Sequence, residues 1–260
     1  EPEFKTVPIR HDGVDTEKLK ESIEKYNPKL FYAVPNFHNP SGITYSEENR
    51  KQVSDIMKDS STIFIEDDPY GELRFIGNKV PSMKKYMNDN VILLGSFSKI
   101  VSPGMRLGWI HAGHEIMEKL IIAKQGADLH SNYFSQRVVY EYLKENNIEV
   151  HIEKITDLYK KQRDCMVNSI EKYFPKEVQT TKPEGGMFIW VTLPENYSSM
   201  DLFNIAIKKK VAFVPGDPFY TGKEGVNAFR LNYTNSTEDK IEEGIKILAE
   251  GIKELLSEKN

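Results

Sequence analysis

The sequence predicts an α/β protein, with part of a mainly parallel sheet followed by a smaller α+β region. Three observations support this prediction. Short apolar runs recur through the first half of the chain, helical patterns separate most of them, and clusters of polar and turn-forming residues follow them. Strands of this apolar kind are typical of a parallel sheet that helices cover on both faces.

Four apolar runs are predicted strands, and two capped helices lie among them. Asp15 is expected to cap a helix with Leu19 and Ile23 on one face, and Ser46 begins a second helix with acids in its first turn. The predicted strands are residues 30–34, 62–65, 91–94 and 106–110.

Helices dominate from Glu115 onward, with three further predicted strands. A long helix is predicted with one face formed by Ile152, Ile155, Tyr159 and Met166. A last helix is predicted to begin at Ser236 or Thr237, with apolar residues at helical spacing: Ile241, Ile245, Leu248, Ile252 and Leu255. The strands are expected at 186–191, 211–214 and 228–231. We therefore divide the chain into domains 1–147 and 148–260.

Composition excludes several classes of function. A net charge of −4 argues against a broad nucleic-acid surface. Cys165 is the single cysteine, so no intrachain disulfide can form and a reducing, cytoplasmic setting is favoured. The six histidines lack metal-ligand spacing, no metal site is expected, and no apolar run is long enough to span a membrane.

Polar residues follow the predicted strands where an α/β sheet binds ligands, beyond the carboxyl ends of its strands. Lys99 follows the third strand, and a lysine in a sheltered site can attack a carbonyl carbon. Ser96, Ser98 and Arg106 could bind a phosphate beside it. The alternative for Lys99 taken alone is a solvated surface lysine beside a loop.

Asp67 ends the second strand, and a carboxylate there needs a partner such as a protonated pyridine nitrogen. Tyr70 and Asn39 could reach a phenolate oxygen on the same ring. The alternatives are a turn cap formed by Asp67 and Asp68 and a simple tight turn at residues 39–42. His38, beside Asn39, is either a loop histidine or part of a substrate pocket.

Several segments, taken in order, resemble the class I/II aminotransferases of pyridoxal 5′-phosphate (PLP) fold type I. The resemblance covers essentially the whole chain. The matching segments are Asn39-Pro40-Ser41-Gly42, Asp67-Asp68-Pro69-Tyr70, Ser96-Phe97-Ser98-Lys99, Pro103-Gly104-Met105-Arg106-Leu107-Gly108-Trp109, Pro183-Glu184-Gly185-Gly186-Met187-Phe188 and Phe229-Arg230-Leu231-Asn232.

The resemblance implies PLP as cofactor and a role for each matching residue. Lys99 would attach PLP as a Schiff base and then act as general acid and base. Asp67 would pair with the pyridinium nitrogen, and Arg230 would bind the substrate α-carboxylate. The remaining cofactor contacts would come from Asn39 and Tyr70 at O3′ and from Ser96, Ser98 and Arg106 at the phosphate.

The resemblance also implies that residues 1–147 are only the C-terminal part of a PLP-binding large domain, and 148–260 the small domain. Family members have a preceding segment with a phosphate-binding loop and an aromatic residue that stacks on the ring, and they build their site at a homodimer interface. We expect the intact protein to be a homodimer. We expect this chain alone to be inactive and to bind PLP weakly or not at all.

Two functions from different classes fit the resemblance. The first is an aminotransferase that moves an amino group between an α-amino acid and a 2-oxo acid, although C–S lyases and acyltransferases share the fold. The second is the PLP-binding effector domain of a GntR/MocR-type transcription regulator, which would bind DNA only through a separate N-terminal domain. The sequence upstream of Glu1 discriminates between them.

Overall fold

The computed structural model describes residues 2–87, 90–222 and 226–257, which form two compact units. The sheet unit comprises Lys5–Asn36 and Ile43–Ile155. The C-terminal unit comprises the residues up to Phe4, the segment Phe37–Gly42 and the chain from Thr156 onward. The helix α5 (Ile148–Tyr173) runs from one unit into the other. The predicted domain boundary near residue 147 falls just before this helix and stays a prediction.

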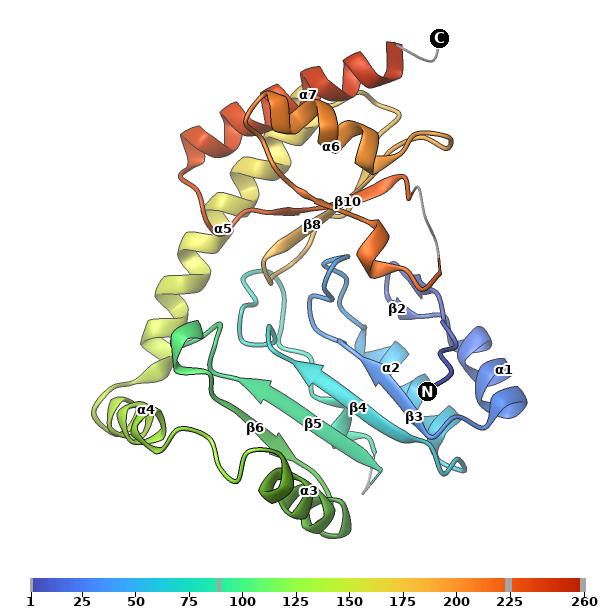
Figure 1. Cartoon of the computed structure of the whole chain (residues 1–260), viewed down its shortest axis with the longest axis vertical. Coiled ribbons are helices and arrows are strands. Elements are labelled where there is room, and N and C mark those ends of the chain that lie inside the picture. Colours follow the sequence, from blue (N-terminus) through green and yellow to red (C-terminus); the bar gives the residue numbers. More distant parts are fainter. Residues whose placement is uncertain (1, 88–89, 223–225, 258–260) are drawn as a thin grey trace. The chain divides into compact units, whose positions relative to one another are not determined.

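A four-stranded sheet in the order β3-β4-β5-β6 is the centre of the sheet unit (Figure 1). The strands are β3 (Leu30–Ala33), β4 (Ile63–Asp68), β5 (Val91–Ser96) and β6 (Gly108–His111). β3, β4 and β5 are parallel, and β6 pairs with β5 in the antiparallel sense. The prediction of a mainly parallel sheet in an α/β protein is confirmed.

Helices and short elements connect these strands. Asp15 accepts a hydrogen bond from the Lys18 amide and Ser46 from the Asn49 amide, so both predicted helix caps are present. The other elements of the sheet unit are β1 (Ile9–Arg10), β2 (Gly13–Val14), α1 (Thr16–Tyr26), α2 (Glu47–Met57), the 3₁₀ turns η1 (Met83–Lys85) and η2 (Pro103–Met105), α3 (His114–Ala127) and α4 (Tyr133–Glu145).

One face of the sheet is buried and packs against an apolar core. Phe64 and Val91 are fully buried from this face, and Val53 and Met57 of α2 pack into the same cluster. Phe31 meets Phe64 edge-on with ring centroids 5.2 Å apart. Burial of this apolar area is the main favourable term in the folding of this unit.

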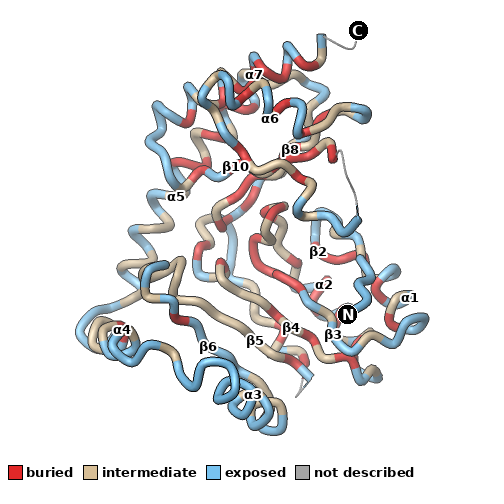
Figure 2. The backbone as a smooth tube through the Cα atoms, viewed as in Figure 1, coloured by how far each residue is buried: buried red, intermediate tan, exposed pale blue. Residues whose placement is uncertain are grey.

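The opposite face is open in the part of the chain that the structure describes. Leu30 and Tyr32 on this face of β3 are more than half exposed, and Ile110 of β6 is 44% exposed. Figure 2 shows β6 and α3 almost wholly in the exposed class. The expectation of a sheet covered on both faces therefore holds for one face only among the described residues.

An antiparallel sheet with helices forms the C-terminal unit. Its strand order is β7-β8-β10-β9, with β7 (Gln179–Thr180), β8 (Phe188–Thr192), β9 (Val214–Pro215) and β10 (Ala228–Asn232). The helices are α6 (Ser199–Lys208), the 3₁₀ turn η3 (Asp217–Phe219) and α7 (Glu238–Ser257), besides the part of α5 from Thr156. All five residues predicted for the apolar stripe of the last helix are buried.

The predicted strand at 211–214 is largely absent, because its first residues complete the end of α6. The Val211 amide donates to the Ala206 carbonyl, and Lys210 adopts a left-handed conformation with φ 63°. An amide used to close a helix end cannot join a strand ladder, so pairing begins only at Val214.

Two kinds of structural feature are absent from the residues that the structure describes. No helix in this part of the chain is long and apolar enough to cross a membrane. The same residues contain no group of three or more histidine, cysteine, aspartate or glutamate side chains placed to hold a metal ion.

The apolar stripe of α7 gives a prediction about stability. Ile252 is 0% exposed, so Ile252→Ala should lower the free energy of unfolding by about 2–5 kcal/mol, because it removes buried apolar area and leaves a cavity. Urea denaturation followed by circular dichroism measures this change. Lys253→Ala on the exposed side of the same helix is the control and should change the free energy by less than about 0.5 kcal/mol.

Candidate active site

The carboxyl ends of β4 and β5 lie side by side and bring two predicted motifs to one edge of the sheet. Asp67 is in register with Leu94, and Asp68 with Gly95. β4 continues into the turn that contains Tyr70, and β5 continues from Ser96 into the turn that contains Ser98 and Lys99. Parallel pairing therefore places these candidate site segments together, as the fold class predicts.

Adjacent aspartates at the end of β4 point to opposite faces of the sheet and have different partners, because side chains alternate along a strand. Asp68 accepts a hydrogen bond from the Gly71 amide over 2.8 Å and caps the turn. Asp67 accepts instead from the Tyr32 hydroxyl over 2.6 Å. The turn-cap alternative considered for both residues therefore describes Asp68, and Asp67 is held on the open face.

Tyr32 is a site neighbour that the sequence analysis missed. It lies on β3 opposite Ile65, two residues from Asp67 and on the same face. Burial and then the hydrogen bond to Asp67 raise the pKa of the Tyr32 hydroxyl, so it remains a donor to the carboxyl group. The alternation of residues 30–34 could have revealed it, because Tyr32 interrupts an otherwise apolar run.

The turn after β5 holds the two serines and Lys99. The Ser98 amide donates to Ser96 Oγ over 3.1 Å, and the amides of Val101 and Ser102 both donate to the Phe97 carbonyl. Lys99 is half-buried, and within the described residues its amine makes no hydrogen bond or ion pair. Hydrogen bonds from its backbone amides thus fix the turn, while the Lys99 amine is left available for a ligand.

Arg106 ends the connection between β5 and β6 and is exposed. It adopts a left-handed conformation with φ 53°, and its Nη1 donates to the Pro103 carbonyl over 3.2 Å. Ser96 pairs with Gly108, so Arg106 and Ser98 each lie two residues beyond the last paired residues of the two strands. The three predicted phosphate ligands therefore lie at one end of this strand pair.

In the C-terminal unit, the structure joins two residues that are far apart in the sequence. Arg230 Nη1 donates to Asn39 Oδ1 over 2.6 Å. A guanidinium can only donate hydrogen bonds, so the amide oxygen of Asn39 must face it, and the amide nitrogen is turned outward as a donor. An outward amide donor suits an anionic oxygen such as the phenolate expected at O3′.

Two aromatic rings orient the guanidinium of Arg230. Its Cζ lies 4.2 Å from the ring centroid of Phe188 on β8 and 5.2 Å from that of Phe219 in η3. Trp190 packs edge-on against Phe219, with ring centroids 5.7 Å apart. These contacts hold the planar group in a defined orientation, which favours bidentate binding of a carboxylate.

The segment 37–42 packs against the turn before β8. Gly186 has φ 74°, and a Cβ there would lie 2.5 Å from Phe37 Cβ, so both the conformation and the close approach require glycine. The Tyr233 hydroxyl donates to the Gly185 carbonyl over 2.9 Å and stabilises the same turn. Asn39 thereby acquires a fixed support within the C-terminal unit, and the Asn39-Pro40 peptide bond is cis.

His38 lies in this segment as a loop histidine. Its Nδ1 is 2.9 Å from Ser41 Oγ, within the turn itself. Burial lowers the pKa of the His38 imidazole to about 4, so the ring is neutral at physiological pH.

The predicted site residues thus fall into two sets. Asn39 and Arg230 are bonded to each other in the C-terminal unit. Asp67, Tyr70, Ser96, Ser98, Lys99 and Arg106 lie at the β4 and β5 ends of the sheet unit.

Comparison with known proteins identifies the family. Residues 3–248 match the model described as aminotransferase class I and II. The chain belongs to this family. It is 42% identical to aromatic-amino-acid aminotransferase 1 of Thermococcus litoralis, over 98% of the chain and 62% of that relative.

A solved structure agrees with this assignment. The kynurenine aminotransferase of Pyrococcus horikoshii, determined with PMP, matches with a TM-score of 0.94 and 45% identity, over 98% of the chain and 64% of that protein. The family also has relatives of another kind: the HTH-type transcriptional regulator YisV of Bacillus subtilis is 34% identical over 96% of the chain and 51% of its own length. The chain spans less than two thirds of each of these three proteins.

The close approach of β5 and β6 gives a second prediction. A Cβ at Gly95 would lie 2.1 Å from Trp109 Cε2, so Gly95→Ala must displace the indole and should lower stability by about 1–3 kcal/mol. In a Trp190→Phe background Trp109 is the single tryptophan, and its fluorescence should shift to the red. Gly104→Ala is the control, because the nearest atom to its Cβ is Ser102 Oγ at 3.8 Å. Identical spectra for the two variants would contradict the prediction.

The buried His38 predicts a loss of stability in acid. Its pKa is about 4 in the folded state and 6.5 in the reference state, so the unfolded chain binds more protons between these values. The free energy of unfolding is therefore unaffected by the titration of His38 above pH 6.5. It decreases as the pH falls toward 4, by about 2 kcal/mol after allowance for the partial exposure of the ring. His38→Asn keeps an acceptor for Ser41 without titrating. Denaturation at pH 7 and pH 4.5 should show a smaller loss for this variant than for the wild type.

Proposed function

We propose that the full-length protein is a PLP-dependent aminotransferase that moves an amino group between an α-amino acid and a 2-oxo acid. The observation that supports this proposal most strongly is the in-register pairing of β4 with β5, which brings the Asp67 and Ser96–Lys99 segments to one edge of the sheet. A lysine amine, an acidic group and hydroxyl donors at one edge form a donor set that fits PLP.

Each residue has a task in the proposed reaction. Bound PLP would withdraw electrons from the substrate's reacting carbon. The Asp67 carboxyl group, oriented by Tyr32, would pair with the ring nitrogen, and Ser96, Ser98 and Arg106 would hold the phosphate. Asn39 and Tyr70 would donate hydrogen bonds to O3′.

Lys99 and Arg230 would act on the substrate. The Lys99 amine would attach the cofactor and, once released, move a proton at Nζ to and from the reacting carbon. Arg230, oriented by Phe188, Phe219 and Asn39, would bind the α-carboxylate as a fork. The bidentate carboxylate site favours α-amino acids. We extend the proposal to a homodimer on the basis of the family resemblance, and to a cytoplasmic location on the basis of the single cysteine.

A second function rests on the regulator relatives. The effector domain of a GntR/MocR-type regulator would use the same cofactor residues, with DNA bound by a separate N-terminal domain. A helix-turn-helix encoded upstream of Glu1 would support the regulator, and an aminotransferase N-terminal region would support the enzyme.

The assignment of Lys99 can be tested in the full-length protein. Borohydride reduction with PLP should add the cofactor's mass to the peptide containing Lys99, and Lys99→Ala should abolish both the adduct and amino-group transfer, with a loss of at least about 10³-fold in rate. Lys124→Ala, on exposed α3, is the control and should leave both unchanged. An adduct that survives Lys99→Ala at another lysine would overturn the assignment.

A further inference from the structure

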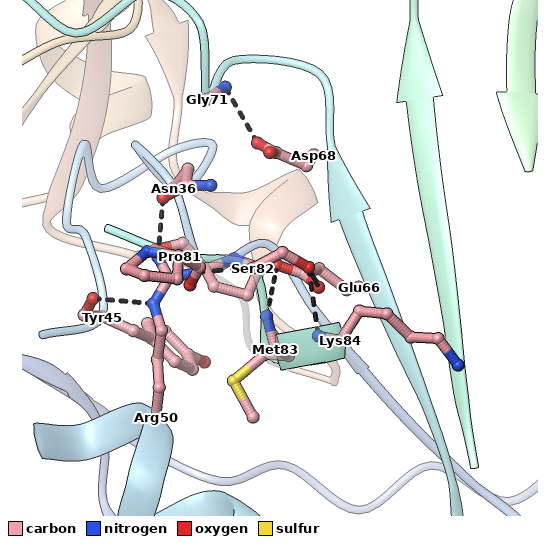
Figure 3. A network of polar contacts seen from close by, with 11 residues as sticks. Asn36, Tyr45, Arg50, Glu66, Asp68, Gly71, Pro81, Ser82, Met83 and Lys84 are labelled. Carbon is pink, nitrogen blue, oxygen red and sulfur yellow. Dashed lines mark hydrogen bonds and ion pairs between the residues drawn. The ribbon is translucent and has the colours of Figure 1, made fainter. Parts of the chain in front are cut away.

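Arg50 of α2 is fully buried and connects three separate segments of the sheet unit (Figure 3). Its Nε donates to the Tyr45 carbonyl over 3.1 Å and its Nη2 to the Pro35 carbonyl over 3.2 Å. Its Nη1 donates to the Pro81 carbonyl over 2.9 Å. Pro35 and Tyr45 lie on either side of the segment 37–42, so one guanidinium holds both ends of the loop that contains Asn39.

A second line of contacts runs from Arg50 to the turn that contains Tyr70. Arg50 Nη2 donates to Asn36 Oδ1 over 2.6 Å, and Asn36 in turn hydrogen-bonds to Asp68. Asp68 accepts from the Gly71 amide, beside Tyr70. Polar groups therefore join the stems of the Asn39 loop to the Tyr70 turn. Figure 3 shows the bond between Arg50 and Asn36 and the bond between Asp68 and Gly71.

Glu66 completes the network from β4. Its Oε1 lies 3.7 Å from Arg50 Nη1, and it accepts hydrogen bonds from Ser82 Oγ over 2.5 Å and from the Met83 amide over 3.1 Å. Burial raises the pKa of Glu66 and lowers the pKa of Arg50, and the attraction between the two charges opposes both shifts. The hydrogen bonds from Ser82 and Met83 oppose the shift of Glu66 only.

A buried ion pair of this kind is a weak source of net stability, because desolvation of the two charges offsets their attraction. Apolar residues of similar size could fill the same space in the core. What they could not do is donate to four acceptors on three segments at fixed angles, which requires the planar fork of arginine. The geometry therefore favours a role in fixing the loops over a role in the core alone.

We propose that Arg50 is a positioning residue that, within the sheet unit, fixes the two stems of the Asn39 loop and joins them to the turn of Tyr70. This inference rests on the proposed function, since it assigns Asn39 and Tyr70 to O3′. Arg50 itself touches neither cofactor nor substrate in this arrangement; it acts through Asn36, Asp68 and the loop backbone.

The test compares Arg50→Lys with Val53→Ala in the full-length protein loaded with PLP. Lysine keeps the positive charge near Glu66 but cannot hold both stems of the loop, because its three donors lie on a single nitrogen. Val53 lies in the same helix and is 0% exposed, so its truncation weakens the core without touching the network. The two variants are compared at temperatures equally far below their melting points.

Hydrogen exchange of the amides in residues 36–45 is the first readout. The bonds from Gly42 to the His38 carbonyl and from Tyr45 to the Pro35 carbonyl report on the loop. Exchange should accelerate about tenfold in Arg50→Lys and stay within about twofold of wild type in Val53→Ala. PLP dissociation constants, measured by equilibrium dialysis, should rise about tenfold in Arg50→Lys alone.

The outcomes separate the two proposals. Equal exchange in Arg50→Lys and Val53→Ala overturns the positioning role whether or not PLP binds. A wild-type protein that binds no PLP contradicts the proposed function, and the exchange comparison then still decides whether Arg50 fixes the loop. If Arg50→Lys does not fold, Asn36→Ala replaces it, because this change removes the link between Arg50 and Asp68 without altering charge. Unchanged exchange of the Gly71 amide in Asn36→Ala would overturn the link from Arg50 to the Tyr70 turn.

Discussion

The parallel pairing of β4 with β5 is the constraint on which the candidate site depends. Pairing in register brings the ends of the two strands to one edge, so that the segments after Asp68 and Ser96 begin side by side. Those segments are short, and hydrogen bonds from their backbone amides to the Asp68 and Ser96 side chains and to the Phe97 carbonyl fix them. The positions of the candidate groups therefore follow from the sheet, which is far more rigid than a loop that lacks such support.

Alternation along β4 gives three consecutive acids different chemical environments. Glu66 and Asp68 face the covered side, where both belong to the buried network around Arg50. Asp67 faces the open side, where Tyr32 holds it. A shift of one residue in strand pairing would exchange these environments and turn Glu66 away from its partner Arg50. The buried network thus helps to define the register on which the site depends.

Local signals in the sequence predicted much of this structure. The parallel strands, the caps at Asp15 and Ser46 and the stripe of α7 follow from periodicity and hydrogen-bonding preferences over a few residues. The motif residues were found through family resemblance, since Lys99 alone looks like a surface lysine. Tyr32 and Arg50 were missed because their partners, Asp67 and the stems of the Asn39 loop, are distant along the chain and are brought near only by folding. The strand at 211–214 was wrong because α6 uses the Val211 amide.

The two outer strands of the sheet have a consequence for how this chain meets other polypeptides. β3 and β6 each have a neighbour on one side only within the described residues, so each presents a row of backbone donors and acceptors. Neither strand contains a lysine, glutamate or proline of the kind that natural proteins place on free edges, and Leu30, Tyr32, Trp109 and Ile110 add exposed apolar side chains. Both strands are therefore suited to extension of the sheet by a further strand. Unless such a strand is supplied, the same edges are the places where separate molecules would adhere to one another.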